Sequence, residues 1–398
     1  MKNIIIYDIF EIRENLLPLT FTRPVSEIRV GITTLKEKWQ YFFKEDTFSY
    51  LTTEYLQPKY TTQVENDNYF IAGHIVATSE LAHAIKSLTI GEALKSGNEI
   101  IAFRGSLEDF NAKNFATTKE YCEKTTAIRW LYDIFMLNGE VLESDFRNMT
   151  TGRISQPLSN TNTVIGAPTF DDGTPKIFIE EGACVEGAFL NVTKGPIYIG
   201  KNCEVMEGSC IRAPFAMCEG SIVNMGTRIY GATTLGKFCK VGGELNNVVM
   251  IGYSNKGHDG FLGNAVIGEW CNLGAGCSAS NLKNDYTEIK LWNYPAHRFL
   301  RTGLQFCGLI MGDHSKAGVN SIFNTATVIG VGVNIHGTGF PRNFVPSFSE
   351  GSSAGFTDVS LVKFFAIAER VMARRNVVLT DADKEIFQNI FAIADNYK

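Results

Sequence analysis

The chain of 398 residues is too long for one ordinary hydrophobic core, and its length predicts two domains with an appendage. Its formal net charge of -5 gives no basic footprint for nucleic acid or for an anionic membrane surface, so an anionic ligand must meet a local cationic site. No apolar run is long enough for a signal-peptide core or a membrane span, which favours a cytoplasmic protein.

The first 150 residues alternate apolar, strand-like runs with segments of helical periodicity, as in IIIYD, LLPLTFTRPVSEIRVGITTLKEKW and YFIAGHIVATSELAHAIKSL. This alternation predicts an α/β, Rossmann-like domain at residues 1–150. The stretch LLPLTFTRP resembles the Leu-x-Pro-Leu-Thr-x-x-x-Pro-Lys segment of sugar-1-phosphate nucleotidyltransferases, which follows their phosphate-binding loop. The resemblance implies nucleotidyl transfer from a nucleoside triphosphate (NTP) to a sugar 1-phosphate, with Mg²⁺.

The motif departs from this family in two respects. Residues 1–30 contain no glycine, so the Gly-rich turn that would cradle nucleotide phosphates is missing, and Val25 stands where the family has its lysine. Arginine suits bidentate phosphate binding, and Asp8 is a candidate Mg²⁺ ligand, although an Asp that ends a strand is usually a cap. The candidate nucleotide ligands are Arg13, Thr20, Arg23 and Arg29. The alternative is a solvated helix face with structural arginines.

A Ser/Thr/Asn-rich linker is predicted at residues 151–163, and a six-residue period follows it. The apolar series is unbroken at Ile199, Val205, Ile211, Met217, Val223, Ile229, Leu235 and Val241, and it resumes within 267–279 and 311–335. Six is the period of neither a helix nor a simple strand, so the backbone must turn at every sixth residue. Three such segments close a triangular coil. The repeat therefore predicts a parallel β-helix at residues 164–350.

This hexad pattern resembles that of the left-handed β-helix acyltransferases, and the resemblance implies a homotrimer with active sites between subunits. Nine cysteines are present, without CxxC or Cys/His spacing typical of zinc sites. Four of them occupy a slot that Ser or Thr fills in other hexads, namely Cys203, Cys239, Cys271 and Cys277. Small size explains these four better than redox or metal chemistry.

The period is lost at residues 242–266 and 281–309, and loops that leave a rigid solenoid often carry ligand chemistry, although many are only decorations. The first interruption contains YSNKGHDGFLG, in which His258 lies in a Gly-rich stretch of a chain with six histidines. Histidine can accept a proton near neutral pH, as the base of an acyl transfer must. Glu244 could orient the ring; Asp259 is a weaker partner, because adjacent side chains in extended backbone point opposite ways.

The run KGHDGFLGNAVIG followed by CNLGAGCSASN resembles the acetyltransferase half of the GlmU-type enzymes, which combine N-acetylglucosamine-1-phosphate uridylyltransferase and glucosamine-1-phosphate N-acetyltransferase activities. The family has Lys-Ala-Gly-His before Leu-Gly-Asp-Ala and Asn-Ile-Gly-Ala-Gly hexads. The resemblance implies that His258 is the catalytic base, with acetyl-CoA as the acetyl donor to an amino-sugar phosphate. It also implies that Asn272 and Asn281 contact ligands and that Ala275 contacts acetyl-CoA.

The chain departs from the GlmU pattern where the family tyrosine is Phe261 and a family lysine is Asn246. The lost phosphate-binding charge has alternative sources in Lys256, Lys283 and Lys290, with Arg228 as a weaker one. The expected substrate and acetyl-CoA ligands are Glu244, Asn246, Lys256, Asn272, Ala275, Asn281 and Lys283.

A helical extension is predicted at residues 351–398. In the stretch LVKFFAIAERVMARR the apolar residues have helical spacing, and the basic residues lie at the carboxyl end, where the helix dipole favours them. We expect it to cap the solenoid or to brace neighbouring subunits. The predicted function is a GlmU-like transferase with small-molecule partners. One alternative is a sugar-1-phosphate nucleotidyltransferase whose β-helix is an oligomerising platform, and another is a non-catalytic sugar-nucleotide sensor or scaffold.

Overall fold

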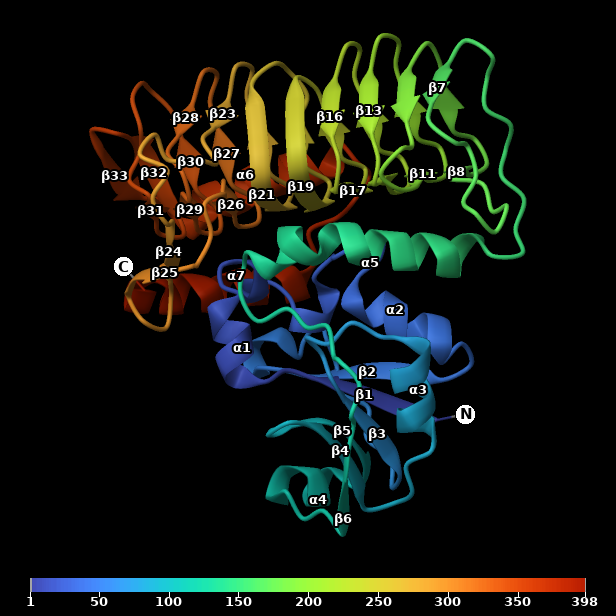
Figure 1. The fold of residues 1–398 in the computed structure, drawn as a ribbon. Coiled ribbons are helices and arrows are strands. Elements are labelled where there is room, and N and C mark those ends of the chain that lie inside the picture. Colours follow the sequence, from blue (N-terminus) through green and yellow to red (C-terminus); the bar gives the residue numbers. More distant parts are fainter. Residues whose placement is uncertain (1, 398) are drawn as a thin grey trace. The chain divides into compact units, whose positions relative to one another are not determined.

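The computed structural model describes residues 2–397, which fold into two compact units (Figure 1). The first unit consists of residues 2–28, 33–130 and 381–389, and the second of residues 29–32, 131–380 and 390–397. Within residues 2–397, no helix combines the length and the apolar character needed to cross a membrane.

The first unit is built on a mixed sheet with the strand order β2-β1-β3-β5-β4-β6. Its strands are β1 (Asn3–Tyr7), β2 (Thr47–Leu51), β3 (Asn68–Ala72), β4 (Glu92–Ser96), β5 (Glu99–Gly105) and β6 (Thr117–Glu120). The helices are α1 (Phe10–Asn15), α2 (Leu35–Phe42), α3 (Ser79–Lys86) and α4 (Leu107–Ala112), with 3₁₀ turns at Leu19–Phe21, Val25–Glu27 and Glu54–Leu56. β1 pairs in parallel with β2 and β3, and its buried isoleucines form the centre of the core.

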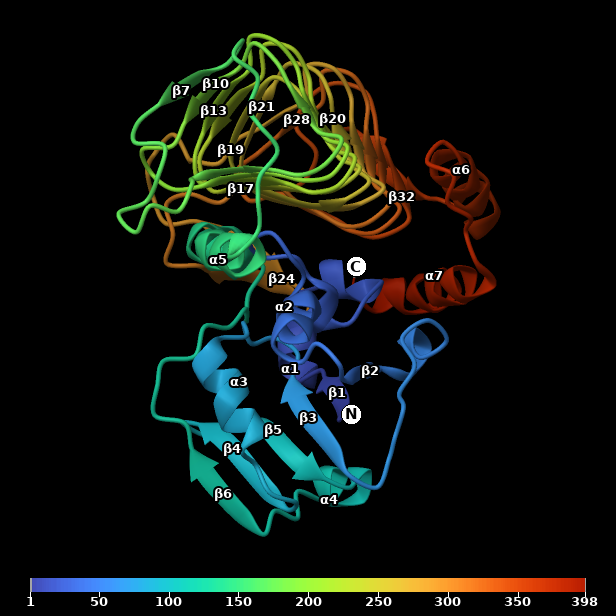
Figure 2. The same cartoon turned by 90° about the vertical axis from the view of Figure 1, so that its right-hand side faces the viewer.

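The second unit is a parallel β-helix whose strands stack into three ladders, which we call the first, second and third faces (Figure 2). The first face contains β7 (Thr163–Ile165), β10 (Phe189–Asn191), β13 (Cys210–Arg212), β16 (Arg228–Tyr230), β23 (Ser278–Ala279) and β28 (Ile322–Phe323). The second face contains β8 (Ile177–Ile179), β11 (Ile197–Ile199), β14 (Phe215–Met217), β17 (Thr233–Lys237), β26 (Ile310–Met311), β29 (Val328–Ile329) and β31 (Phe344–Val345).

The third face carries the strands on which the candidate site is built. It contains β9 (Cys184–Val185), β12 (Glu204–Val205), β15 (Ile222–Val223), β18 (Lys240–Val241), β20 (Asn255–Lys256), β22 (Asn272–Leu273), β27 (Lys316–Ala317), β30 (Asn334–Ile335) and β32 (Ser349–Ser352), with β33 (Gly355–Asp358) antiparallel to β32. The long strands β19 (Glu244–Gly252) and β21 (Phe261–Glu269) belong to both other faces, because Asn247 and Asn264 bend them at positive φ.

The apolar hexad series points inward, as predicted. Ile199, Val205, Met217, Leu235 and Val241 are all at most 1% exposed and belong to one continuous core. The four cysteines of the small-residue slot are buried free thiols. This arrangement confirms the predicted fold class, an α/β unit followed by a parallel β-helix with C-terminal helices.

The second unit also contains the helices α5 (Asp133–Thr150) and α6 (Leu361–Ala373). The helix α7 (Asp381–Ala394) is divided between the units, with residues 381–389 in the first, and a 3₁₀ turn follows it at Asp395–Tyr397. α5 lies within the residues predicted for the N-terminal domain but belongs to the second unit, since Leu142 and Phe146 share a core cluster with Tyr198 and Ala216. The second interruption forms the antiparallel hairpin of β24 (Lys290–Asn293) and β25 (Arg298–Arg301).

Candidate functional site

His258 lies at the corner where the chain passes from β20 on the third face to β21 on the first. Neighbouring coils hold the carbonyls of this corner: the Asn224 amide donates to Gly257 O at 2.7 Å, and Gly276 N–H donates to Asp259 O at 3.1 Å. Gly260 has φ +117°, and a Cβ atom there would lie 2.0 Å from the carbonyl oxygen of Cys277. Only glycine fits such a position. The corner is therefore fixed while the His258 side chain stays exposed.

A cavity of about 710 Å³ opens beside His258 within the second unit. Among the predicted ligands, Asn272 and Ala275 line the same cavity as His258. Its apolar wall includes Leu273, Val319 and Val371. The structure thus brings together three of the residues that the GlmU resemblance selected.

Four cationic side chains that were not predicted also line this cavity: Lys240, Lys316, Arg374 and Arg375. The Lys316 ammonium donates to His314 O at 2.7 Å, and burial lowers the pKa of Lys316 to about 8. The Arg375 guanidinium donates to Asn255 Oδ1 at 3.3 Å, which ties the end of α6 to the third face. The cavity is accordingly suited to an anionic ligand.

A ladder of stacked rings forms another part of the wall. The Tyr253 and Trp270 rings stack with centroids 4.2 Å apart and planes at 15°, and both residues have positive φ at successive corners of the coil. Phe238 continues the ladder against Tyr253 at 5.4 Å. Aromatic faces beside cations are a common environment for a nucleotide base next to phosphate groups.

The repeat pattern of the sequence could have identified two of these four cationic residues. Lys240 and Lys316 each precede an inward repeat residue, Val241 or Ala317. They therefore point outward on the third face, in the same register column as Asn255 and Asn272. Arg374 and Arg375 carry no such signal, because only tertiary packing of α6 brings them to the cavity.

The structure places Glu244 and Asn246 on β19, and neither residue lines the cavity. The Glu244 carboxylate pairs with the Arg228 guanidinium at 3.4 Å, which corrects the expectation that Glu244 orients the His258 ring. No hydrogen bond to the His258 ring is made by any residue in the described range 2–397. Within the part of one chain that the structure describes, the His258 ring therefore has no orienting partner.

Lys256 was expected to bind phosphate, and its placement corrects that expectation. The side chain points into the β-helix and is 1% exposed, with its ammonium bonded to backbone carbonyls. Lys256 does not line the cavity beside His258.

Asn281 and Lys283 lie in the second interruption. The Asn281 amide donates to Asn264 Oδ1 at 2.8 Å. Lys283 and Lys290 line a second, open groove of about 1090 Å³, together with Arg342 and the stacked pair Trp292 and Phe344. The structure therefore separates these two lysines from the cavity beside His258.

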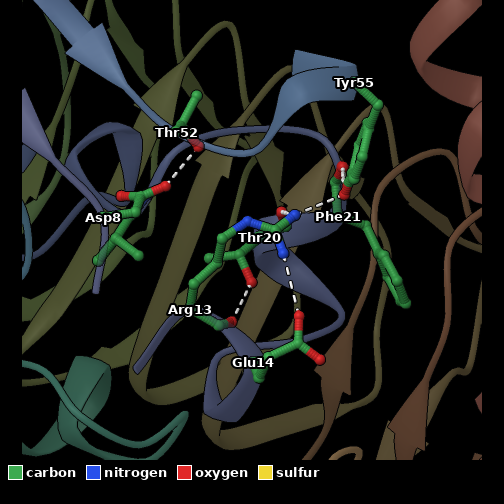
Figure 3. A network of polar contacts seen from close by, with 8 residues as sticks. Asp8, Arg13, Glu14, Thr20, Phe21, Thr52 and Tyr55 are labelled. Atoms are coloured by element: carbon green, nitrogen blue, oxygen red, sulfur yellow. Dashed lines mark hydrogen bonds and ion pairs between the residues drawn. The ribbon is translucent and has the colours of Figure 1, made fainter. Parts of the chain in front are cut away.

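In the first unit, Arg13 and Thr20 bind each other instead of facing an open site (Figure 3). The Arg13 guanidinium donates to Thr20 O at 2.9 Å and to the Tyr55 hydroxyl at 2.5 Å, and it pairs with Glu14 at 3.1 Å. The Thr20 hydroxyl donates back to Arg13 O at 2.6 Å. This network anchors the LLPLT turn, which corrects the expectation that Arg13 offers its charge to a nucleotide.

Arg23 is also buried, whereas Arg29 lies in the second unit. The Arg29 guanidinium donates to the carbonyls of Ile251, at 3.2 Å, and Ile32. The four predicted nucleotide ligands therefore do not form one cluster. The physical cause is clearest for Arg13 and Arg29, whose guanidinium groups donate to backbone carbonyls and, for Arg13, to the Tyr55 hydroxyl.

Asp8 directly follows β1, and both of its carboxylate oxygens accept hydrogen bonds, one from Val25 N–H at 3.0 Å and one from the Thr52 hydroxyl at 2.6 Å. Figure 3 shows the bond from Thr52. Burial raises the pKa of Asp8 to about 6. Over residues 2–397, no group of three or more His, Cys, Asp or Glu side chains is arranged to hold a metal ion. The residues around Asp8 thus do not form a Mg²⁺ site by themselves.

Comparison with known proteins relates the chain to two kinds of transferase. Residues 4–154 match the sugar nucleotidyl transferase family. A bifunctional sugar-1-phosphate nucleotidylyltransferase/acetyltransferase of Sulfurisphaera tokodaii is 28% identical over 145 residues, which are 36% of each chain. The bifunctional protein GlmU of a Synechococcus strain is 25% identical over 159 residues, covering 36% of this chain and 31% of that protein.

The matched part therefore spans about a third of the length of these curated relatives. Among solved structures, the Arabidopsis UDP-N-acetylglucosamine acyltransferase aligns at 12% identity over 60% of this chain and 90% of that one. Its TM-score of 0.23 is too low to carry a structural argument.

Proposed function

We propose that this chain, a diverged GlmU-like protein, N-acetylates an amino-sugar phosphate in the cavity beside His258, with acetyl-CoA as the acetyl donor. The observation that carries the proposal is that an exposed histidine lies at a fixed corner and lines the same cavity as Asn272, Ala275 and a set of cations. Coenzyme A is an anionic molecule with an adenine ring and an apolar pantetheine arm. Cations, stacked rings and aliphatic side chains in one cavity suit those three parts.

In the proposed mechanism, the His258 imidazole removes a proton from the substrate ammonium group. The free amine then attacks the thioester carbonyl carbon, and a carbon–nitrogen bond forms while the carbonyl oxygen gains negative charge. The Asn272 amide lines the same cavity and is the proposed donor to that oxygen. Collapse of the tetrahedral intermediate breaks the carbon–sulfur bond, and the coenzyme A thiolate receives the proton from the imidazolium. The acylated nitrogen releases its remaining extra proton to solvent, which leaves a neutral amide.

The test is thiol release from acetyl-CoA in the presence of glucosamine 1-phosphate. His258→Ala should lower kcat by about 10²–10⁴-fold without loss of folding, because general-base assistance has that typical size. His336→Ala is the matched control, since His336 is also an exposed corner histidine of the β-helix and does not line the cavity. Full activity of His258→Ala would overturn the proposal.

A second activity, nucleotidyl transfer from an NTP to a sugar 1-phosphate, is proposed for the first unit. The match of residues 4–154 to the sugar nucleotidyl transferase family supports it. Pyrophosphate release from UTP and N-acetylglucosamine 1-phosphate is the assay. Asp8 alone does not make a Mg²⁺ site, because both of its carboxylate oxygens already accept hydrogen bonds from Val25 and Thr52.

The proposed assembly is a homotrimer, in which a neighbouring subunit would supply the orienting partner that His258 lacks within one chain. The first face offers exposed Ile165, Phe189 and Tyr230 for such a contact. Light scattering should give three times the monomer mass, and a monomeric, active protein would overturn the shared-site arrangement.

A further inference from the structure

The charged side chain of Lys256 lies inside the β-helix. The inward column of the third face runs through Val205, Val223, Val241, Lys256, Leu273, Ala317 and Ile335. Lys256 is therefore stacked between Val241 and Leu273, and it is one of the largest fully buried side chains of the chain. A buried ammonium group is costly unless hydrogen bonds satisfy its protons, so its acceptors explain why it is tolerated.

Lys256 has two hydrogen-bond acceptors, one at the corner that carries the proposed base and one on the preceding coil. Its ammonium donates to His258 O at 2.7 Å and to Gly242 O, on the preceding coil, at 3.1 Å. Among residues 2–397, Lys256 is the only donor to the His258 carbonyl. Burial lowers the pKa of Lys256 to about 8, and a hydrogen bond from the ammonium form is stronger than a neutral one.

The corner is thus held from two sides. From outside, the Asn224 amide binds Gly257 O at 2.7 Å, and from inside Lys256 binds His258 O. The Glu244 N–H holds Gly260 O at 3.0 Å from the preceding coil. An inward-pointing carbonyl at His258 leaves its exposed imidazole directed to the cavity side of the backbone.

We propose that Lys256 is a positioning residue for His258, which it holds by the backbone carbonyl from inside the β-helix. The inference rests on the proposed function, because it assigns Lys256 a role in the acetyl transfer that His258 would catalyse. Lys256 does not touch the substrate; it keeps the base at the distance and angle that proton removal requires. Small displacements of a reacting group lower rates strongly, so the effect should appear in kcat.

The experiment is a double-mutant cycle between Lys256→Met and His258→Ala, with thiol release from acetyl-CoA and glucosamine 1-phosphate as the readout. Methionine keeps the length of the side chain and suits the aliphatic column, but it cannot donate to His258 O. We expect Lys256→Met to lower kcat about tenfold or more with little change in the KM for acetyl-CoA. In the His258→Ala background, the same substitution should change kcat less than about twofold, because the base it positions is gone.

Val223→Ala is the matched control, since it removes volume from the same column without altering a hydrogen bond at the corner. It should lower Tm and leave kcat unchanged at a temperature where the protein is folded. Lys256→Gln, which keeps a polar donor, is the second variant if Lys256→Met does not fold. Failure of both to fold would overturn the positioning role and assign Lys256 to stability alone.

The remaining outcomes separate the two claims. The inference would be overturned if folded Lys256→Met had an unchanged kcat, or if Lys256→Met lowered kcat by the same factor with His258 present and with His258→Ala. In either case, a low kcat of His258→Ala alone would still support the proposed function. An active His258→Ala would overturn the proposed function itself, together with the ground for the inference.

Discussion

The His258 corner and the Asp8–Arg13 network were each predicted from a short motif, and they differ in where their polar groups point. At the corner, backbone carbonyls are held by neighbouring coils, and the side chains of His258 and Asn272 are left to line a cavity. In the network, the side chains bind other groups of the protein: the Arg13 guanidinium binds Thr20 O, the Tyr55 hydroxyl and the Glu14 carboxylate. A rigid scaffold can free side chains for ligands, whereas a motif that holds its own turn together cannot.

The largest expected effect concerns the scaffold of the corner. Gly260→Ala would place a Cβ atom 2.0 Å from Cys277 O at φ +117°, so both the clash and the backbone strain oppose folding. We expect a loss of more than about 4 kcal/mol of unfolding free energy. Chemical denaturation followed by circular dichroism measures it.

Gly226→Ala is the matched control for this substitution. Gly226 also has positive φ, at +67°, but nothing lies within 4 Å of the added Cβ atom. Strain alone should cost about 1 kcal/mol. Equal stabilities for the two variants would show that the Cys277 contact does not restrict the corner.

The next effect tests the opposite region. Arg13→Met should lower the stability of the first unit by about 3 kcal/mol, because it leaves the buried Glu14 carboxylate and Thr20 O without their guanidinium partner. Arg129→Met, at a more exposed ion pair with Glu99, should cost less than about 1 kcal/mol. Both values come from denaturant titration. A stable Arg13→Met that loses only pyrophosphate release would instead return Arg13 to nucleotide binding.

The difference between the regions also shows what the sequence could predict. The hexad period determined the β-helix, because burial at every sixth residue is a property of the chain itself. The period could not predict that Lys256 points inward. Val241 and Lys256 are neighbours in the inward column of the third face, but the segment between them is shorter than the three hexads that make a regular coil. In such a shortened coil, counting in steps of six no longer identifies the inward residues. Only the register of β18 with β20 shows that Lys256 points inward.

The partners of Arg13 and the cations of the cavity could not be predicted from the sequence, for another reason. Nothing local indicates that Arg13 will bind Tyr55 or that Arg374 will reach the cavity, because both contacts depend on packing between distant segments. Residue types predicted the chemistry that these positions can perform. Tertiary structure decides whether their donors remain available for a ligand.

The smallest expected effect tests whether the donors of the cavity are in fact available. Arg374 is exposed at the end of α6 and lines the cavity, so it would meet the phosphates of acetyl-CoA as a screened surface charge. Arg374→Gln should raise the KM for acetyl-CoA about three- to tenfold and leave kcat unchanged, since the contact would be the same in the ground state and the transition state. Arg370→Gln, also exposed on α6 but outside the cavity lining, should change neither constant. The effect of Arg374→Gln should shrink at high salt; an equal response of both variants would mean that α6 acts through its overall charge and that the cavity does not select the ligand.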